Sequence, residues 1–159
     1  MTDSVVTEAS VVRWNAPSRA AHPARDAAIR SYDAVLRKDK QAWLANFAED
    51  GWIEDPVGPS MFDEEGTGHH GPEACARFWD ITIATVARFE FEINDSFVCA
   101  DECVNVGVIH TTLSNGYRAA CEGVFHYTVD DTGKLVSLRA FWELDRMAAT
   151  VQPPPAADQ

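Results

Sequence analysis

The sequence predicts an α+β fold in which helices come first and pack on a sheet formed by the later part of the chain. Apolar residues recur at helical spacing over residues 23–48 and 71–87, and from residue 89 onward apolar and polar residues alternate as in strands. The pair Asn115-Gly116 lies between two of the alternating runs and is typical of a hairpin turn. Helices followed by consecutive antiparallel strands are expected to cover one face of a single sheet.

Three helices are expected in the first half of the chain. Residues 23–38 form the first, because their apolar side chains make one continuous stripe. That stripe consists of Ala28, Ile29, Tyr32, Val35 and Leu36. A short second helix is expected over residues 40–48. The run Gly71-Pro72-Glu73 opens a third helix, since proline is well suited to the first helical turn, and this helix is expected to reach residue 87.

Five strands are expected. The first covers residues 51–57, between the second and third helices. The other four follow the third helix, and they cover residues 89–98, 103–113, 118–129 and 134–145. In the last of these, apolar side chains alternate with Ser137, Arg139 and Glu143, so one face should be buried and the other wet.

Composition limits what the protein can bind. A net charge of −12 disfavours nucleic acid and anionic membranes as partners, because both attract basic surfaces. No apolar run approaches the roughly 20 residues of a membrane span, and the N-terminus lacks a signal-peptide pattern. We therefore expect a cytoplasmic protein with one domain over residues 23–150, a flexible N-terminal arm over 1–22 and a disordered, Pro-rich tail over 151–159.

No metal or cofactor is expected. The four cysteines show no Cys-x-x-Cys spacing and lie in apolar segments, so buried free thiols are favoured over disulfides or a zinc site. The pair His69-His70 lacks a further set of ligands around it.

Asp55 is the strongest candidate for chemistry. In a strand it shares a face with Ile53, and Pro56 forces it into an extended conformation. If that face is the core face, Asp55 lies at the mouth of an apolar cavity, where desolvation raises its pKa and makes it a suitable base. The alternative is that Asp55 begins an Asp-Pro turn and caps backbone amides.

The run Phe47-Ala48-Glu49-Asp50, followed by Ile53-Glu54-Asp55-Pro56-Val57-Gly58, resembles the Δ5-3-ketosteroid isomerases and, more broadly, the NTF2-like (SnoaL-like) superfamily. The resemblance covers residues 25–147, including a last-strand motif at 133–142. It implies a cone of helices on a curved, mostly antiparallel sheet around an apolar pocket. It also implies a cofactor-independent homodimer, formed through the outer face of the sheet, that binds a small apolar ligand such as a steroid.

The same resemblance assigns site residues. Asp55 would be the base that shuttles the proton, and Tyr32 the donor that stabilises the enolate oxygen; alternatively, Tyr32 is a core aromatic that bonds a backbone carbonyl. Trp79 matches a tyrosine that supports the oxyanion tyrosine. Trp142 and Phe78 match walls of the steroid pocket, with core packing as the alternative for both tryptophans.

One departure from the family pattern affects the expected activity. The family builds its oxyanion hole from a tyrosine and a protonated acid, and ungapped counting places this acid at Phe125, which cannot donate a hydrogen bond. Glu122 is nearby but is expected on the opposite face. We therefore expect a weak steroid isomerase. The alternatives are a steroid- or polyketide-binding protein with little turnover and a related polyketide cyclase that uses Asp55 on another carbonyl.

Overall fold

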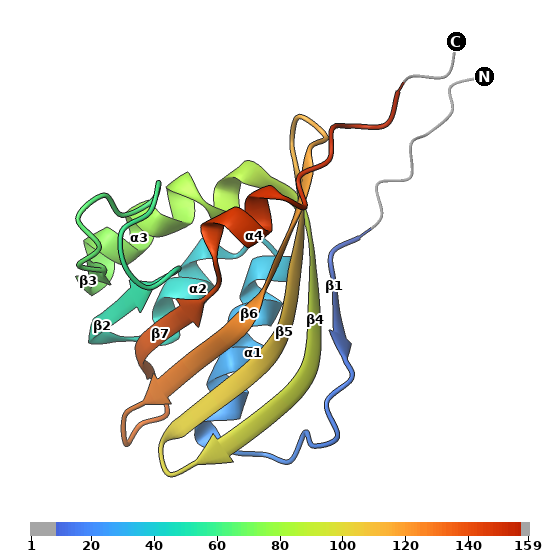
Figure 1. The fold of residues 1–159 in the computed structure, drawn as a ribbon. Helices are drawn as coiled ribbons and strands as arrows, with labels where there is room; N and C mark the ends of the chain where they lie inside the picture. Colours follow the sequence, from blue (N-terminus) through green and yellow to red (C-terminus); the bar gives the residue numbers. More distant parts are fainter. Residues whose placement is uncertain (1–8, 157–159) are drawn as a thin grey trace.

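The computed structural model describes residues 9–156 and has the expected α+β architecture (Figure 1). Its helices are α1 (Pro23–Leu36), α2 (Lys40–Ala45), α3 (Gly71–Ile81), the 3-10 turn η1 (Ile83–Thr85) and α4 (Leu144–Ala148). Its strands are β1 (Val11–Trp14), β2 (Phe47–Glu54), β3 (His69–His70), β4 (Val86–Cys99), β5 (Glu102–Leu113), β6 (Arg118–Val129) and β7 (Leu135–Phe141).

All the strands form one curved sheet in the order β1-β4-β5-β6-β7-β2-β3. The long strands β4, β5, β6 and β7 are antiparallel neighbours, whereas β1 joins β4 and β2 joins β7 in parallel. Helix α1 packs across β4, β5 and β6, so the core lies between the helices and the concave face of the sheet (Figure 1). The α+β prediction is therefore confirmed.

Two glycines allow the strong bend of the sheet. Gly107 of β5 faces Gly123 of β6. A Cβ atom on Gly107 would lie 1.9 Å from the carbonyl oxygen of Glu92, and one on Gly123 would lie 2.2 Å from that of Phe141. Any side chain at either position would push neighbouring backbone apart, so both sites require glycine for the close approach that bends the sheet around α1.

Helix α1 begins where the sequence predicts. The His22 ring accepts a hydrogen bond from the backbone amide of Ala24 (3.1 Å), and Pro23 occupies the first helical turn. The helix ends at Leu36 because Lys38 takes a left-handed conformation with a φ of 55°. Its buried face carries several alanines, whose small side chains let the helix approach the sheet closely, and Tyr32 lies on the same face.

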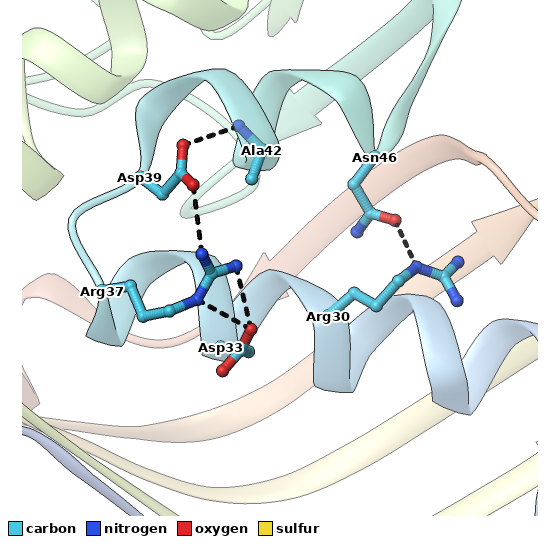
Figure 2. Close-up of polar contacts among 6 residues, drawn as sticks. All are labelled: Arg30, Asp33, Arg37, Asp39, Ala42 and Asn46. Carbon is cyan, nitrogen blue, oxygen red and sulfur yellow. Dashed lines mark hydrogen bonds and ion pairs between the residues drawn. The ribbon is translucent and has the colours of Figure 1, made fainter.

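Polar side chains fasten α2 onto α1 (Figure 2). The Asp39 carboxylate accepts a hydrogen bond from the Ala42 amide (3.0 Å) and so caps α2, and Arg37 links Asp39 to Asp33 at 3.1 and 3.0 Å. Near the other end of α2, Arg30 donates to the Asn46 side-chain oxygen (3.0 Å), and the Asn46 amide donates to the Ala27 carbonyl (2.8 Å). These contacts join the two helices.

Several predicted boundaries were wrong. Helix α3 ends at Ile81 rather than near residue 87, because three of the residues Thr82 to Thr85 are β-branched and disfavour a helix interior. Strand β2 begins at Phe47, inside the predicted second helix. The last strand ends at Phe141, and α4 begins at Leu144, inside the predicted strand.

Backbone pairing occurs within the segments predicted as arm and tail. Val11–Trp14 forms β1 in parallel with β4, and Arg13 pairs with Glu90. At the other end, Gln152 exchanges two backbone hydrogen bonds with Arg118 (2.9 and 3.0 Å). Residues 1–8 and 157–159 lie outside the described part of the chain.

The four cysteines are free, and burial differs among them. Cys75 and Cys103 are buried as expected, whereas Cys121 is partly buried and Cys99 is exposed at the end of β4, contrary to expectation. Within residues 9–156, no helix has both the length and the apolar character that crossing a membrane requires.

Candidate functional site

A cavity of about 350 Å³ lies between the helices and the concave face of the sheet. Its walls are mainly apolar. Five of the residues predicted from the sequence line it: Tyr32, Asp55, Phe78, Phe125 and Trp142. The structure thus brings together side chains from α1, α3, β6 and the segments that follow β2 and β7.

Asp55 is held at the end of β2 by the neighbouring strand. The parallel pairing of Glu54 with Arg139 and the backbone hydrogen bond from Val57 to Ala140 (2.9 Å) tie this segment to β7. Glu54 points elsewhere and pairs with the Arg139 side chain at 3.4 Å. The period-two alternation of the strand therefore separates the two carboxylates as the sequence predicts.

The Asp55 carboxylate accepts a hydrogen bond from the Trp142 indole nitrogen at 2.6 Å. In the described part of the chain it caps no backbone amide, so it does not act as the Asp-Pro turn cap. Burial raises its pKa from 3.8 to about 6, and the Trp142 hydrogen bond opposes this rise. A carboxyl group with such a pKa is ionised at neutral pH yet holds a proton more readily than an exposed aspartate.

The raised pKa predicts a pH-dependent stability. The folded state binds the Asp55 proton more tightly than the unfolded chain does, so the stability that this proton contributes is lost as the pH rises through about 6. We expect the stability advantage of Asp55→Asn over wild type to grow by roughly 1 to 3 kcal/mol between about pH 4 and about pH 8. Urea unfolding of both proteins at the two pH values tests this, and an unchanged difference would contradict the burial of the Asp55 carboxyl.

Tyr32 places its hydroxyl group among buried polar atoms. The hydroxyl oxygen accepts one hydrogen bond from the Asn105 amide (2.9 Å) and one from the Tyr127 hydroxyl (3.0 Å). Burial raises the pKa of Tyr32 to about 12, whereas the two hydrogen bonds act to lower it. Tyr32 therefore keeps its proton at neutral pH and can donate it in a hydrogen bond. Because it bonds these side chains, it is not the core aromatic that bonds a backbone carbonyl.

Sequence reasoning missed Asn105 and Tyr127. Asn105 is fully buried in β5 and Tyr127 is nearly so in β6. The available signal for Asn105 was a polar residue that shares a strand face with buried Cys103. Tyr127 also lines the cavity.

Phe125 occupies the position at which the resemblance implies an acid. It is 2% exposed, and its neighbours in register are Asn105 on β5 and Ala140 on β7. Glu122 does not take over that position, because it is exposed and pairs with Arg146 at 3.1 Å. The cavity wall therefore has an apolar ring where a second donor would lie.

Trp79 is not brought into this group. It is buried and packs against the Trp43 ring, with ring centroids 5.4 Å apart, but it does not line the cavity. The supporting position that the resemblance implies for its indole is taken by Tyr127 and Asn105.

The two histidines of the pair His69-His70 pack against aromatic rings. His69 packs its ring on Phe78, with centroids 5.1 Å apart, and His70 stacks on Trp52 at 5.2 Å. Among residues 9–156, no group of three or more His, Cys, Asp or Glu side chains is arranged to hold a metal ion.

The site combines a base, Asp55, a neutral hydrogen-bond donor, Tyr32, and an apolar cavity that both residues line. A carboxylate with a raised pKa can remove a proton from a carbon next to a carbonyl group. A neutral hydroxyl at the same cavity can stabilise the negative charge that then develops on the carbonyl oxygen.

Known proteins share this fold. The sequence model of the SnoaL-like domain matches residues 28–138. The chain is similar to RV0760c from Mycobacterium tuberculosis, with 31% identity and a TM-score of 0.76 over 85% of this chain and 98% of that chain. RV0760c in complex with estradiol-17β-hemisuccinate gives 31% identity and a TM-score of 0.75, over 83% and 99% of the two chains. A Δ5-3-ketosteroid isomerase from Mycobacterium sp. gives 33% identity and a TM-score of 0.75, over 83% and 98%. No curated protein matches the chain in sequence.

Proposed function

We propose a function for this chain on the premise that it belongs to the SnoaL-like family. It moves a proton between two carbon atoms of a flat, apolar ketone, as a Δ5-3-ketosteroid isomerase does, but at a lower rate. The observation that carries the proposal is that Asp55 and Tyr32 line the same apolar cavity. The raised pKa of Asp55 supports a base that can both take up and return a proton.

The reaction needs no other reactant. The Asp55 carboxylate takes a proton from the carbon next to the ketone, and the electron pair of the broken C–H bond moves onto the carbonyl oxygen as a conjugated enolate. Tyr32 donates a hydrogen bond to that oxygen. Protonated Asp55 then delivers the proton to the distal carbon of the conjugated system, the ketone re-forms, and the double bond ends in conjugation with it.

The relatives support a steroid as the ligand class. One similar structure is a Δ5-3-ketosteroid isomerase and another holds estradiol-17β-hemisuccinate. In this chain, Phe78, Phe125 and Trp142 supply apolar surface for a flat ring system. Burial of such a ligand depends on these walls and not on the catalytic groups.

Phe125 also favours a second candidate function, a steroid-binding protein with little turnover. An oxyanion site that lacks one donor loses on the order of 100-fold to 1000-fold in rate, whereas the apolar ring of Phe125 adds to binding. The two candidates differ only in turnover.

The test measures binding and turnover separately. Because Trp43 and Trp142 line the cavity, ligand binding should quench tryptophan fluorescence. We expect wild type to bind a planar ketosteroid with micromolar affinity and to convert a Δ5-3-ketosteroid slowly to the conjugated enone, followed by its absorbance.

The matched variant Tyr32→Phe removes only the hydroxyl group. It should lower the turnover number by on the order of 100-fold while the dissociation constant changes only a few-fold. Absence of steroid binding by wild type would sink both candidate functions. Binding without turnover would leave the steroid-binding candidate.

We also propose a homodimer formed through the outer face of the sheet. Register places five apolar residues side by side on that face, and we call them the outer patch: Phe97, Val104, Val106, Val124 and Phe141. Three of these are exposed, which is unusual for large apolar side chains gathered in one place. Glu102 and Arg139 lie at the margin of the outer patch, because Glu102 is two residues before Val104 on β5 and Arg139 is two residues before Phe141 on β7. Two copies related by a two-fold axis can therefore match apolar surface with apolar surface and negative charge with positive charge.

Light scattering is expected to give twice the chain mass at micromolar concentration. Val106→Lys should shift the mass to that of one chain, because a lysine at the centre of the patch buries an unpaired charge. The control is Ile81→Lys, which replaces an exposed apolar residue on α3 and should leave the dimer intact. A wild-type monomer would contradict this proposal without affecting the cavity.

A further inference from the structure

Behind Tyr32, away from the cavity, a buried arginine begins a line of polar groups. Arg25 of α1 is 2% exposed. Its Nε atom donates to the Ser96 hydroxyl (3.0 Å), and its Nη atoms donate to the carbonyl oxygens of Ser96 (3.2 Å) and Ala20 (2.8 Å). Its Nη1 atom also donates to the Ser18 hydroxyl at 3.4 Å. Within residues 9–156 Arg25 has no carboxylate partner, so a full positive charge is buried against neutral acceptors.

The line continues through β4 and β5 to Tyr32. The Ser96 hydroxyl lies 3.8 Å from the Cys103 sulfur, and the Cys103 thiol donates to the side-chain oxygen of Asn105 at 3.3 Å. The Asn105 amide nitrogen then donates to the Tyr32 hydroxyl at 2.9 Å. Because the thiol is the donor to the oxygen of Asn105, the NH2 group of Asn105 must face Tyr32.

Saturation of the Tyr32 oxygen decides where its proton goes. A phenolic hydroxyl has one proton to donate and two lone pairs that accept. Asn105 occupies one lone pair and Tyr127 the other. The Tyr32 proton is left for the cavity and its occupant.

Hydrogen bonds in such a chain also strengthen one another. Each donor to the Tyr32 oxygen withdraws electron density from it, and the hydroxyl becomes a better donor to a negative oxygen in the cavity. At the far end of the chain, burial raises the pKa of the Cys103 thiol, and the hydrogen bond to Ser96 and the charge of Arg25 oppose that rise. Asn105 lies directly across from Phe125, so this strand pair carries a donor to Tyr32 beside the apolar residue that replaces the acid.

We infer that Asn105 is a positioning residue for Tyr32, and that the buried chain Arg25–Ser96–Cys103–Asn105 aims the Tyr32 proton into the cavity and strengthens it as the donor to a developing oxyanion. This inference rests on the proposed function of the cavity. Asn105 acts through Tyr32 and does not need to touch the ligand.

The test uses 2-naphthol, a flat phenol whose ionised form resembles an enolate and differs from the neutral form in absorbance. Its apparent pKa in the cavity is measured above about pH 7, where Asp55, with its pKa of about 6, stays ionised. Asn105→Leu, which keeps the size of the side chain, should raise the pKa of the bound phenol by about half a unit to one unit. The fall of kcat/KM below about pH 6, which reports the protonation of Asp55, should stay at the same pH in this variant.

A pair of variants at Cys103 gives a second test with a milder change. Cys103→Ser keeps a donor to the Asn105 oxygen and should leave the bound phenol as in wild type. Cys103→Ala removes that donor, and the pKa of the phenol should rise in the same direction as in Asn105→Leu. If Asn105→Leu does not fold, this pair decides the question.

The control is Asn46→Leu, which alters another buried asparagine that bonds Arg30 and Ala27 and does not line the cavity. It is expected to lower stability without shifting the phenol. Equal shifts in Asn46→Leu and Asn105→Leu, or no shift in Asn105→Leu and Cys103→Ala while 2-naphthol still binds, would overturn the inference alone. Failure of wild type to bind 2-naphthol would overturn the proposed function, and this inference with it.

Discussion

Asp55→Asn is expected to lower the turnover number for a Δ5-3-ketosteroid by about 100- to 10,000-fold, the range typical of losing a general base. The amide keeps the shape of the carboxyl group and can still accept from Trp142, so the dissociation constant for steroid should change little. Wild-type kcat/KM should fall as the pH drops below about 6, because Asp55 becomes protonated and no longer accepts the substrate proton.

Glu54→Gln is the matched control for this result. It makes the same chemical change on the neighbouring residue, whose side chain pairs with Arg139 and does not line the cavity. Turnover should be nearly unchanged in Glu54→Gln. If Asp55→Asn keeps the wild-type turnover number, Asp55 is not the base and the mechanism is wrong.

Phe125→Asp is expected to raise the turnover number by on the order of 10- to 100-fold, which is part of the rate that one oxyanion donor typically supplies. Burial at this position favours the neutral form of the new acid, which can then donate a hydrogen bond to the enolate oxygen beside Tyr32. The assay follows the enone absorbance at saturating and subsaturating steroid.

The same substitution should cost stability. Replacing a buried ring by a small polar side chain removes apolar contacts and leaves space, at about 3 kcal/mol or more. Phe125→Leu is the control, because it removes the ring without adding a donor and should leave the turnover number near or below that of wild type. A folded Phe125→Asp protein that is no faster than Phe125→Leu would show that the missing acid does not limit the rate.

Local patterns were sufficient for the elements whose residues interact along the chain. The helical stripe containing Tyr32 predicted α1 and part of its buried face, although Ile29 and Leu36 of that stripe are only partly buried. Asn115-Gly116 predicted the turn between β5 and β6. The period-two alternation before Pro56 separated Asp55 from Glu54, as the structure has them. These features depend on backbone geometry over a few residues, and such geometry can be read from one stretch of sequence.

Local patterns could not predict which strands and side chains pair when they are far apart in the sequence. Val11–Trp14 resembles an unstructured arm by itself and becomes a strand only because β4 offers an open edge. The last strand likewise ends at Phe141, earlier than predicted. The next residue, Trp142, donates a hydrogen bond to Asp55, which lies 87 residues earlier in the chain. Neither partner carries a local signal of the other.

The sequence by itself therefore determined the fold class, part of the core face of α1 and the candidate pair Asp55 and Tyr32. Only the tertiary structure decided that Asn105 and Tyr127, rather than Trp79, support Tyr32, and that a buried Arg25 stands at the far end of that support. The physical reason is that hydrogen bonds between side chains depend on atoms meeting in space within about 3 Å. Residues 73 and 95 positions from Tyr32 reach that distance only after the sheet has curved around the helix.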